Sequence, residues 1–194
     1  MNHYAADAIN ISMKHLLPAI LLFALMGCAS TNQTAMHAGG AFRERNEGYS
    51  LLYKLVSDES EVSNIFILKS ADEPVKSVIK EIAEFMQSVK KQMDEFPKSD
   101  ARIEFDVPDL PRIELKSREL QAQDERNGLL FSSGEKFALR LIFTQAEATN
   151  YATQLAKSLA EIEDDAARKS FLTNVAKRSN ELHDKLMILL IVKS

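Results

Sequence analysis

Apolar residues recur at spacings of three and four along much of this chain, a pattern that predicts amphipathic α-helices. The clearest stripe falls within 70–96 and consists of Val75, Ile79, Ile82, Met86, Val89, Met93 and Phe96. Val78 and Phe85 widen this stripe, so we expect the helix to pack against more than one neighbour. A heptad-like seam of this length is typical of a long helix in a bundle.

The ends of this predicted helix carry local signals. Ser70-Ala71-Asp72-Glu73 fits a capping box, in which a serine and a glutamate three residues later satisfy free backbone N–H groups. Pro74 suits a first helical turn, where its missing N–H costs nothing. Pro97 is expected to end the helix.

Two further stripes lie near the end of the chain. The first comprises Phe137, Leu141, Thr144, Ala148, Tyr151, Leu155, Leu159 and Ile162, and the second Leu172, Val175, Ser179, Leu182, Leu186 and Leu189. No Gly or Pro breaks the junction between them, so one helix across 133–192 stays an alternative. A tight hairpin is favoured, because a continuous stripe would bury Asp165 and Lys169. In the second helix, Glu181 and Lys185 are expected to form a surface ion pair.

Two other stretches give weaker signals. We expect helical structure from Phe42 to about Lys69 with a turn at 57–61, although 65–68 alone also fits a short buried strand. Within 98–115, apolar and polar residues alternate at Ile103, Phe105 and Val107, and two prolines restrict the backbone. This pattern predicts an extended crossover laid over the bundle, or else a small strand.

These elements predict a mostly α-helical bundle of about four to five helices, with long antiparallel helices and an extended crossover near 98–115. The stretch 116–131 is expected to be a helix with a weak apolar stripe. After it, 132–135 is either a second capping box or an interruption in a longer helix. Hydrophobic residues make up 45% of the chain, and Gly and Pro are few, which suits a helical domain with a sizeable core.

The start of the chain follows a different pattern. Lys14 precedes an unbroken apolar run at 16–26, which leads into Gly27 and Cys28. A basic residue before a short apolar core is the layout of a secretory signal peptide, and the run is too short for a permanent transmembrane helix. Leu25-Met26-Gly27-Cys28 resembles the lipobox of bacterial lipoproteins, in which a small residue precedes an obligatory cysteine.

This resemblance implies cleavage between Gly27 and Cys28, attachment of lipid to the Cys28 thiol, and acylation of the new amino terminus, for example with palmitate. Ala29 after the cysteine implies sorting to the outer membrane, facing the periplasm. Cys28 is the only cysteine in the chain, so an internal disulfide is excluded. The alternative is a buried structural cysteine that behaves as a small hydrophobe.

The predicted organisation has three parts. Residues 1–27 are a signal peptide, with translation expected to start at Met13, and 28–41 are a lipidated flexible tether of small and polar residues. A single helical-bundle domain is expected at 42–194. The membrane is therefore the one partner that the start of the chain predicts, reached through the lipid on Cys28.

The sequence shows no constellation typical of catalysis or metal binding. Glu-x-x-His pairs of di-iron bundles, a Gly-x-Ser-x-Gly elbow and a phosphate loop are all missing. His183 lies beside Glu181 and Asp184, but three neighbours on one helix do not form a metal site, and we expect a solvated surface histidine. With a net charge of −4 and no basic stripe, the chain has no footprint for nucleic acid. We expect no catalytic, cofactor-binding or metal-binding residues.

Three classes of function remain open. The leading hypothesis is a non-enzymatic envelope scaffold, adaptor or accessory subunit with an envelope protein as partner. The second is a small-ligand binder with an apolar cavity lined by Tyr49, Phe66, Phe137 and Phe143. The third is an enzyme of unrecognised type. The apolar segment 186–192 is interpreted first as a helix end buried on several sides, and second as a docking surface for a partner or the membrane.

Overall fold

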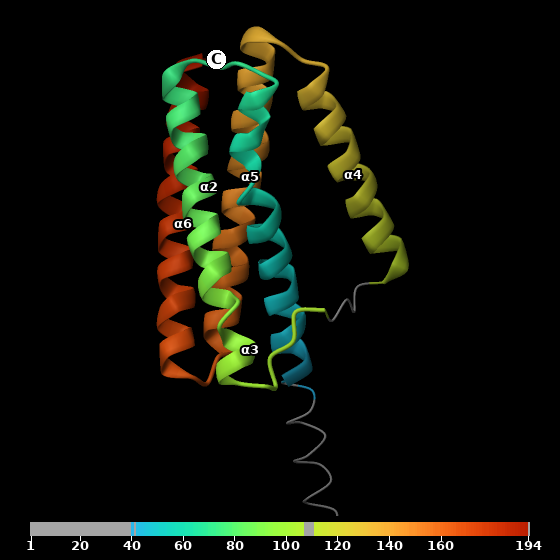
Figure 1. Cartoon of the computed structure of the whole chain (residues 1–194), viewed down its shortest axis with the longest axis vertical. Coiled ribbons are helices and arrows are strands. Elements are labelled where there is room, and N and C mark those ends of the chain that lie inside the picture. Colours follow the sequence, from blue (N-terminus) through green and yellow to red (C-terminus); the bar gives the residue numbers. More distant parts are fainter. Residues whose placement is uncertain (1–39, 41, 107–110, 194) are drawn as a thin grey trace, which may run out of the picture. The chain divides into compact units, whose positions relative to one another are not determined.

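The computed structural model describes residues 40, 42–106 and 111–193, which form helices joined by short connections (Figure 1). In chain order the elements are an N-terminal helix at 42–59, the 3₁₀ helix η1 (Val62–Ile67), α2 (Glu73–Met93), α3 (Phe96–Ser99), α4 (Arg112–Leu130), α5 (Gly134–Ile162) and α6 (Ala166–Lys193). No β-strand occurs in these ranges, so the predicted mostly α-helical bundle is confirmed. The bundle lies within the compact unit Glu44–Ser194.

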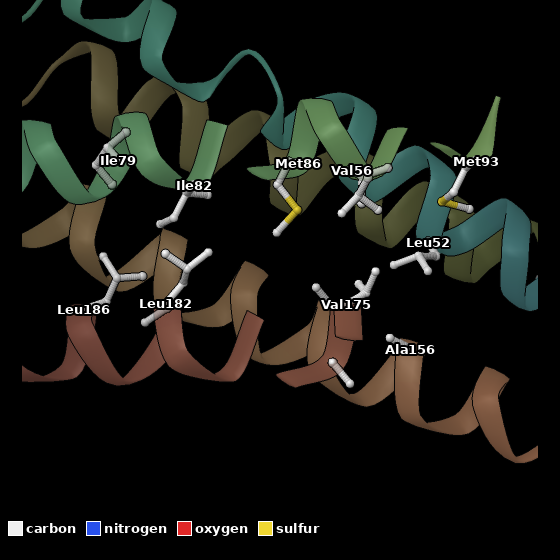
Figure 2. Packing of buried hydrophobic residues seen from close by; sticks show 14 of the residues in the cluster. Leu52, Val56, Ile79, Ile82, Met86, Met93, Ala156, Val175, Leu182 and Leu186 are labelled. Atoms are coloured by element: carbon white, nitrogen blue, oxygen red, sulfur yellow. The ribbon is translucent and has the colours of Figure 1, made fainter. Parts of the chain in front are cut away.

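The apolar stripe of α2 supplies much of the core. The predicted residues that it buries are Val75, Ile79, Ile82, Met86, Val89 and Met93, and Ala83 is buried beside them. Val78 and Phe85, which widen the stripe, are partly buried against the same core. Figure 2 shows Ile79 and Ile82 directed toward the leucines of α6. Since fully burying one such side chain contributes about 1.5–3 kcal/mol, this stripe is a main source of the bundle's stability.

Of the end signals predicted for α2, Pro74 in the first turn is confirmed, whereas the capping box and the end at Pro97 are wrong. The N-cap is Asp72 and no side chain caps the helix, so Ser70 does not form the predicted capping box. The helix ends before Pro97, which lies instead in the first turn of α3, where a proline is tolerated. At the break, Asp94 accepts a hydrogen bond of 2.6 Å from the hydroxyl of Tyr53, so a tertiary contact holds the chain where the helix ends.

The helices α5 and α6 form the predicted antiparallel hairpin, joined at 163–165. The alternative of one continuous helix across 133–192 is therefore wrong. In α6 the predicted stripe is buried at Leu172, Val175, Ser179, Leu182 and Leu186. The charged residues of the junction lie in and beside the turn, where most of them stay in contact with water.

The predicted stripe of α5 is buried at Phe137, Leu141 and Leu159, but its middle part is misplaced. Gln145, Thr149 and Thr153 are buried, whereas the predicted positions 144, 148 and 151 are only partly buried. The Thr149 hydroxyl donates to the carbonyl of Gln145 at 2.7 Å, and the Thr153 hydroxyl donates to that of Thr149 at 2.9 Å. Because these hydroxyls are satisfied within the helix, short polar side chains can occupy the interior.

Two of the weaker predictions are also corrected. Residues 62–67 form η1, so the alternative of a short strand at 65–68 is wrong. The predicted helix at 116–131 is confirmed as α4. Ser133 is the N-cap of α5 but makes no side-chain cap bond, so the second capping box does not form.

The crossover between α3 and α4 is shorter than the predicted 98–115, because these two helices occupy both of its ends. It still covers the bundle as expected, since Ile103 is buried and Phe105 packs against the core. Phe105 also stacks on Tyr53 of the N-terminal helix, with ring centroids 4.5 Å apart. Val107 lies outside the described residues.

Candidate interaction surface

A shallow groove lies between the first turns of α5 and the last turns of α6. It has a volume of about 640 Å³ and is lined by Lys136, Leu139, Arg140, Phe143, Leu190 and Ile191. Figure 1 shows this end of α6, marked C, at the same end of the bundle as the turn that joins α4 to α5. The lining residues of α5 recur at spacings of three and four and so share one face of the helix. The floor of the groove is apolar, and its charged lining residues are both cations.

The last turns of α6 expose apolar side chains beside this groove. Leu186 is buried and Leu189 and Leu190 pack partly against the core. The outward positions are exposed: Ile188 is 61%, Ile191 72% and Val192 78% exposed. The interpretation of 186–192 as a helix end buried on several sides is therefore wrong. Across the groove, Phe143 of α5 is 53% exposed. Apolar side chains gathered from two helices are typical of a surface that binds another molecule.

The α5 side of the groove carries charges that find no ionic partner in the described part of the chain. Lys136, Arg140 and Glu147 lie on one helical stripe and form no ion pair within 42–106 or 111–193. Arg140 extends instead over Gly128 of α4, where an added Cβ would lie only 1.5 Å from a guanidinium nitrogen. The glycine thus allows the end of α4 to pack beside Arg140.

His183 is not the solvated surface histidine that the sequence predicted. It is half-buried, and its Nδ1 lies 2.9 Å from the carbonyl oxygen of Ala146 on α5. Since a carbonyl only accepts hydrogen bonds, Nδ1 is the donor. Its neighbours Glu181 and Asp184 bind other side chains of α6. Among the residues that the structure describes, no group of three or more His, Cys, Asp or Glu side chains is arranged to hold a metal ion.

The predicted pair between Glu181 and Lys185 does not form. Lys185 binds both carboxylate oxygens of Glu81 on α2, each at 2.8 Å, and Arg178 contacts the same carboxylate. The hydrogen bonds of Lys185 are the main cause of a lowered pKa at Glu81. A partner on the neighbouring helix therefore replaces the local pair, and the contact ties α2 to α6.

A buried polar cluster surrounds the carboxylate of Glu163 in the α5–α6 turn. This carboxylate accepts hydrogen bonds from the Tyr49 hydroxyl at 2.5 Å, from Arg168 at 2.9 Å and from the Asp165 backbone N–H at 2.8 Å. The guanidinium of Arg45, also buried, lies 3.5 Å from the same group. The cluster joins the N-terminal helix to the turn of the hairpin.

The pKa shifts in this cluster favour an ionised Glu163 carboxylate that is hydrogen-bonded by a protonated Tyr49. Burial raises the pKa of Glu163, but hydrogen bonds from Arg168 and Tyr49 outweigh it, so the pKa lies below its ordinary value. Burial, together with the adjoining Glu163 carboxylate, raises the pKa of the Tyr49 phenol, which therefore keeps its proton and donates. Sequence reasoning missed this cluster because 114 positions separate Tyr49 from Glu163.

The four aromatic residues considered as linings of a ligand cavity occupy different surroundings. Tyr49 and Phe137 are fully buried in the core, Phe66 is partly buried, and Phe143 faces the groove. Gly27 and Cys28, the predicted cleavage and lipid-attachment residues, lie outside the described residues.

Two further findings complete the description of this surface. No helix within the described ranges is both long enough and apolar enough to cross a bilayer. No protein-family model matches the sequence, and no curated protein or solved structure is significantly similar to it.

Proposed function

We propose that this protein is a lipid-anchored, non-enzymatic scaffold of the bacterial cell envelope that acts by binding protein. The observation that carries this proposal is the groove between α5 and α6, where Phe143 and Ile191 are more than half exposed. Exposed apolar surface is unfavourable in water, and its collection around a groove favours a binding role over chance exposure.

The shape of the groove favours a protein over a small molecule. Pockets for small ligands enclose most of the ligand surface, whereas this groove is shallow and largely open to solvent. Two helices that present an apolar floor are suited to receive a further helix, which would bury apolar side chains at helical spacings.

The anchor is supported by the first part of the sequence. Lys14, the apolar run at 16–26 and the Gly27-Cys28 pair follow the lipoprotein pattern. One acyl chain binds a membrane only marginally, while two or three hold a protein there stably. In this proposal Ala29 directs the chain to the outer membrane, with the bundle in the periplasm.

A Cys28→Ser variant tests the anchor. The unchanged protein should incorporate labelled palmitate and appear as a cleaved form in the membrane fraction. The variant should incorporate no label and accumulate as uncleaved precursor. A processed, membrane-bound Cys28→Ser protein would refute the lipid anchor.

A matched pair of substitutions tests the binding surface. Ile191 on the groove is 72% exposed, and Ile113 on α4 is 76% exposed, so each can be replaced by serine at little cost to folding. After crosslinking in intact cells, Ile191→Ser should remove the crosslinked protein species and Ile113→Ser should retain them. Equal crosslinking in both variants would show that the groove is not the binding surface.

A further inference from the structure

The charges on the outer stripe of α5 are ordered so that the stripe can pair with a second, antiparallel copy of itself. Lys136, Arg140, Phe143 and Glu147 follow one another at spacings of four, three and four, so they lie in a row on one face. Read in one direction the row is two cations, an aromatic ring and an anion. A second copy of the row, turned end for end, presents its anion to the first cation.

We propose that this stripe binds a second copy of the same chain, with the two α5 helices antiparallel about a two-fold axis. Lys136 of each copy then lies opposite Glu147 of the other. Arg140 rests on Gly128 of α4 in the single chain, and in the pairing its guanidinium turns from that glycine to the Phe143 ring of the other copy. The row spans about 16 Å along the helix, and a two-fold axis makes each contact twice. An arginine over an aromatic face adds a cation–π contact.

The row runs between α6 and α4. Leu139, Leu190 and Ile191 lie on its α6 side and provide apolar surface that the pairing covers, while α4 borders its other side through the contact of Gly128 with Arg140. Lys136 and Glu147 are exposed and form no ion pair in the described part of the chain, so both are available to another molecule.

An anionic membrane surface fits this stripe less well, because the stripe also carries the negative charge of Glu147. Glu147 stands on the row with the two cations, and it would be pressed against negatively charged headgroups. In the pairing with a second copy, each of the three charged side chains has a favourable partner. A membrane surface would attract only the two cations.

This inference rests on the proposed function only in taking the groove as a protein-binding surface, and it does not depend on the lipid. The groove is small, so we expect a weak dimer whose assembly requires micromolar or higher concentration. On a membrane, confinement of the anchored chains would raise their effective concentration.

Charge exchange tests the pairing directly. The full chain, purified in detergent, is examined by sedimentation equilibrium between about 1 and 200 µM, the range expected for a small interface. Lys136→Glu and Glu147→Lys each place like charges opposite one another twice, so each should weaken the dimer by about tenfold or more. The double variant Lys136→Glu/Glu147→Lys restores opposite charges in the same register and should recover the dimer.

Controls separate pairing from folding. Lys80→Glu, on an exposed position of α2, should leave the dimer unchanged, and far-UV circular dichroism should show the same helix content in every variant. Phe143→Ser should weaken the dimer without rescue by the charge exchange. A monomer at all concentrations, or a double variant that fails to recover pairing, would overturn the inference. If the monomer still crosslinks to another envelope protein through Ile191, the proposed function stands without the second copy.

Discussion

Glu59 should make the stability of the bundle depend on pH near neutrality. It lies at the end of the N-terminal helix, half-buried, and accepts a hydrogen bond of 2.6 Å from the amide of Gln145 on α5. Burial is the main cause that raises its pKa from 4.5 to about 7, and the charges of Asp58 and Glu125 raise it further. The hydrogen bond from Gln145 opposes the rise without cancelling it.

The sign and size of the effect follow from linkage. A carboxyl whose pKa is raised by folding holds its proton more tightly in the folded chain, so its protonation stabilises the fold. Well below pH 4.5 the carboxyl of Glu59 is protonated in both the folded and the unfolded chain, so it does not affect the free energy of unfolding. As pH rises from 4.5 to about 7, the carboxyl ionises in the unfolded chain first, and the free energy of unfolding falls. One pKa unit is about 1.4 kcal/mol, and because Glu59 keeps some contact with water we expect a total loss of about 2–3 kcal/mol.

Glu59→Gln tests this reasoning, since glutamine keeps the shape of the side chain and removes its titration. Urea unfolding followed by circular dichroism at 222 nm gives the free energy of unfolding of both proteins between pH 4.5 and pH 8. The variant should be more stable than the original by about 2–3 kcal/mol at pH 8, and this difference should shrink as pH approaches 4.5. Glu61→Gln, at an exposed position in the next turn, should follow the original pH profile.

A difference between Glu59→Gln and the original protein that is constant across the pH range would refute the linkage argument. It would mean that the carboxyl ionises in the folded bundle as it does in the unfolded chain. A variant less stable at pH 8 would mean that the ionised carboxylate makes favourable contacts that outweigh its burial.

Two other substitutions test the core and the Glu163 cluster by the same urea assay. Ile82→Asp should cost at least about 4 kcal/mol or prevent folding, because it buries an unpaired charge, whereas Lys80→Asp on the exposed side of α2 should cost less than about 1 kcal/mol. Tyr49→Phe should cost about 1–3 kcal/mol, because it removes a donor from the buried Glu163 carboxylate; Tyr53→Phe, whose partner is part-exposed, should cost less. Equal costs for the two members of either pair would contradict these assignments.

The core-facing sides of α2 and α6 could be predicted from the sequence because large apolar residues mark them at helical spacings. The predicted stripes are buried at Ile79, Ile82, Leu182 and Leu186. The same rule misplaced only the middle of the inner face of α5. There, threonine hydroxyls are satisfied by carbonyls of the preceding turn, and hydrophobicity alone does not reveal that such residues can be buried.

The Glu163 cluster could not be predicted from local patterns. In the sequence, residues 163–165 read as an acidic turn, and the partners of Glu163 are Tyr49 and Arg45 in the N-terminal helix. Only tertiary packing brings a carboxylate, a phenol and a guanidinium together in the interior. The sequence predicted the turn correctly. That the turn also connects the hairpin to the N-terminal helix could be seen only in the fold.

The groove combines the apolar segment 186–192, which is visible in the sequence, with a neighbouring face of α5 that only the fold reveals. The sequence showed that 186–192 is apolar on all sides, but burial or exposure of this segment depends on what lies beside it. Its neighbour across the groove is set by the register of the hairpin, because a shift of one residue rotates a helical face by about 100°. That register is held at the turn, where Glu163 binds the backbone of Asp165 and the side chain of Arg168.

The two ends of the hairpin are therefore linked through the rigidity of its helices. The helix α5 is about 43 Å long, from 29 residues at 1.5 Å each. The fixed turn at one end and the packing of buried side chains along both helices bring Leu190 and Ile191 beside Leu139 and Phe143 at the other. The polar cluster thus has a consequence beyond stability: the register that it helps to hold places Leu190 and Ile191 of α6 beside the row on α5, where the proposed pairing would cover them.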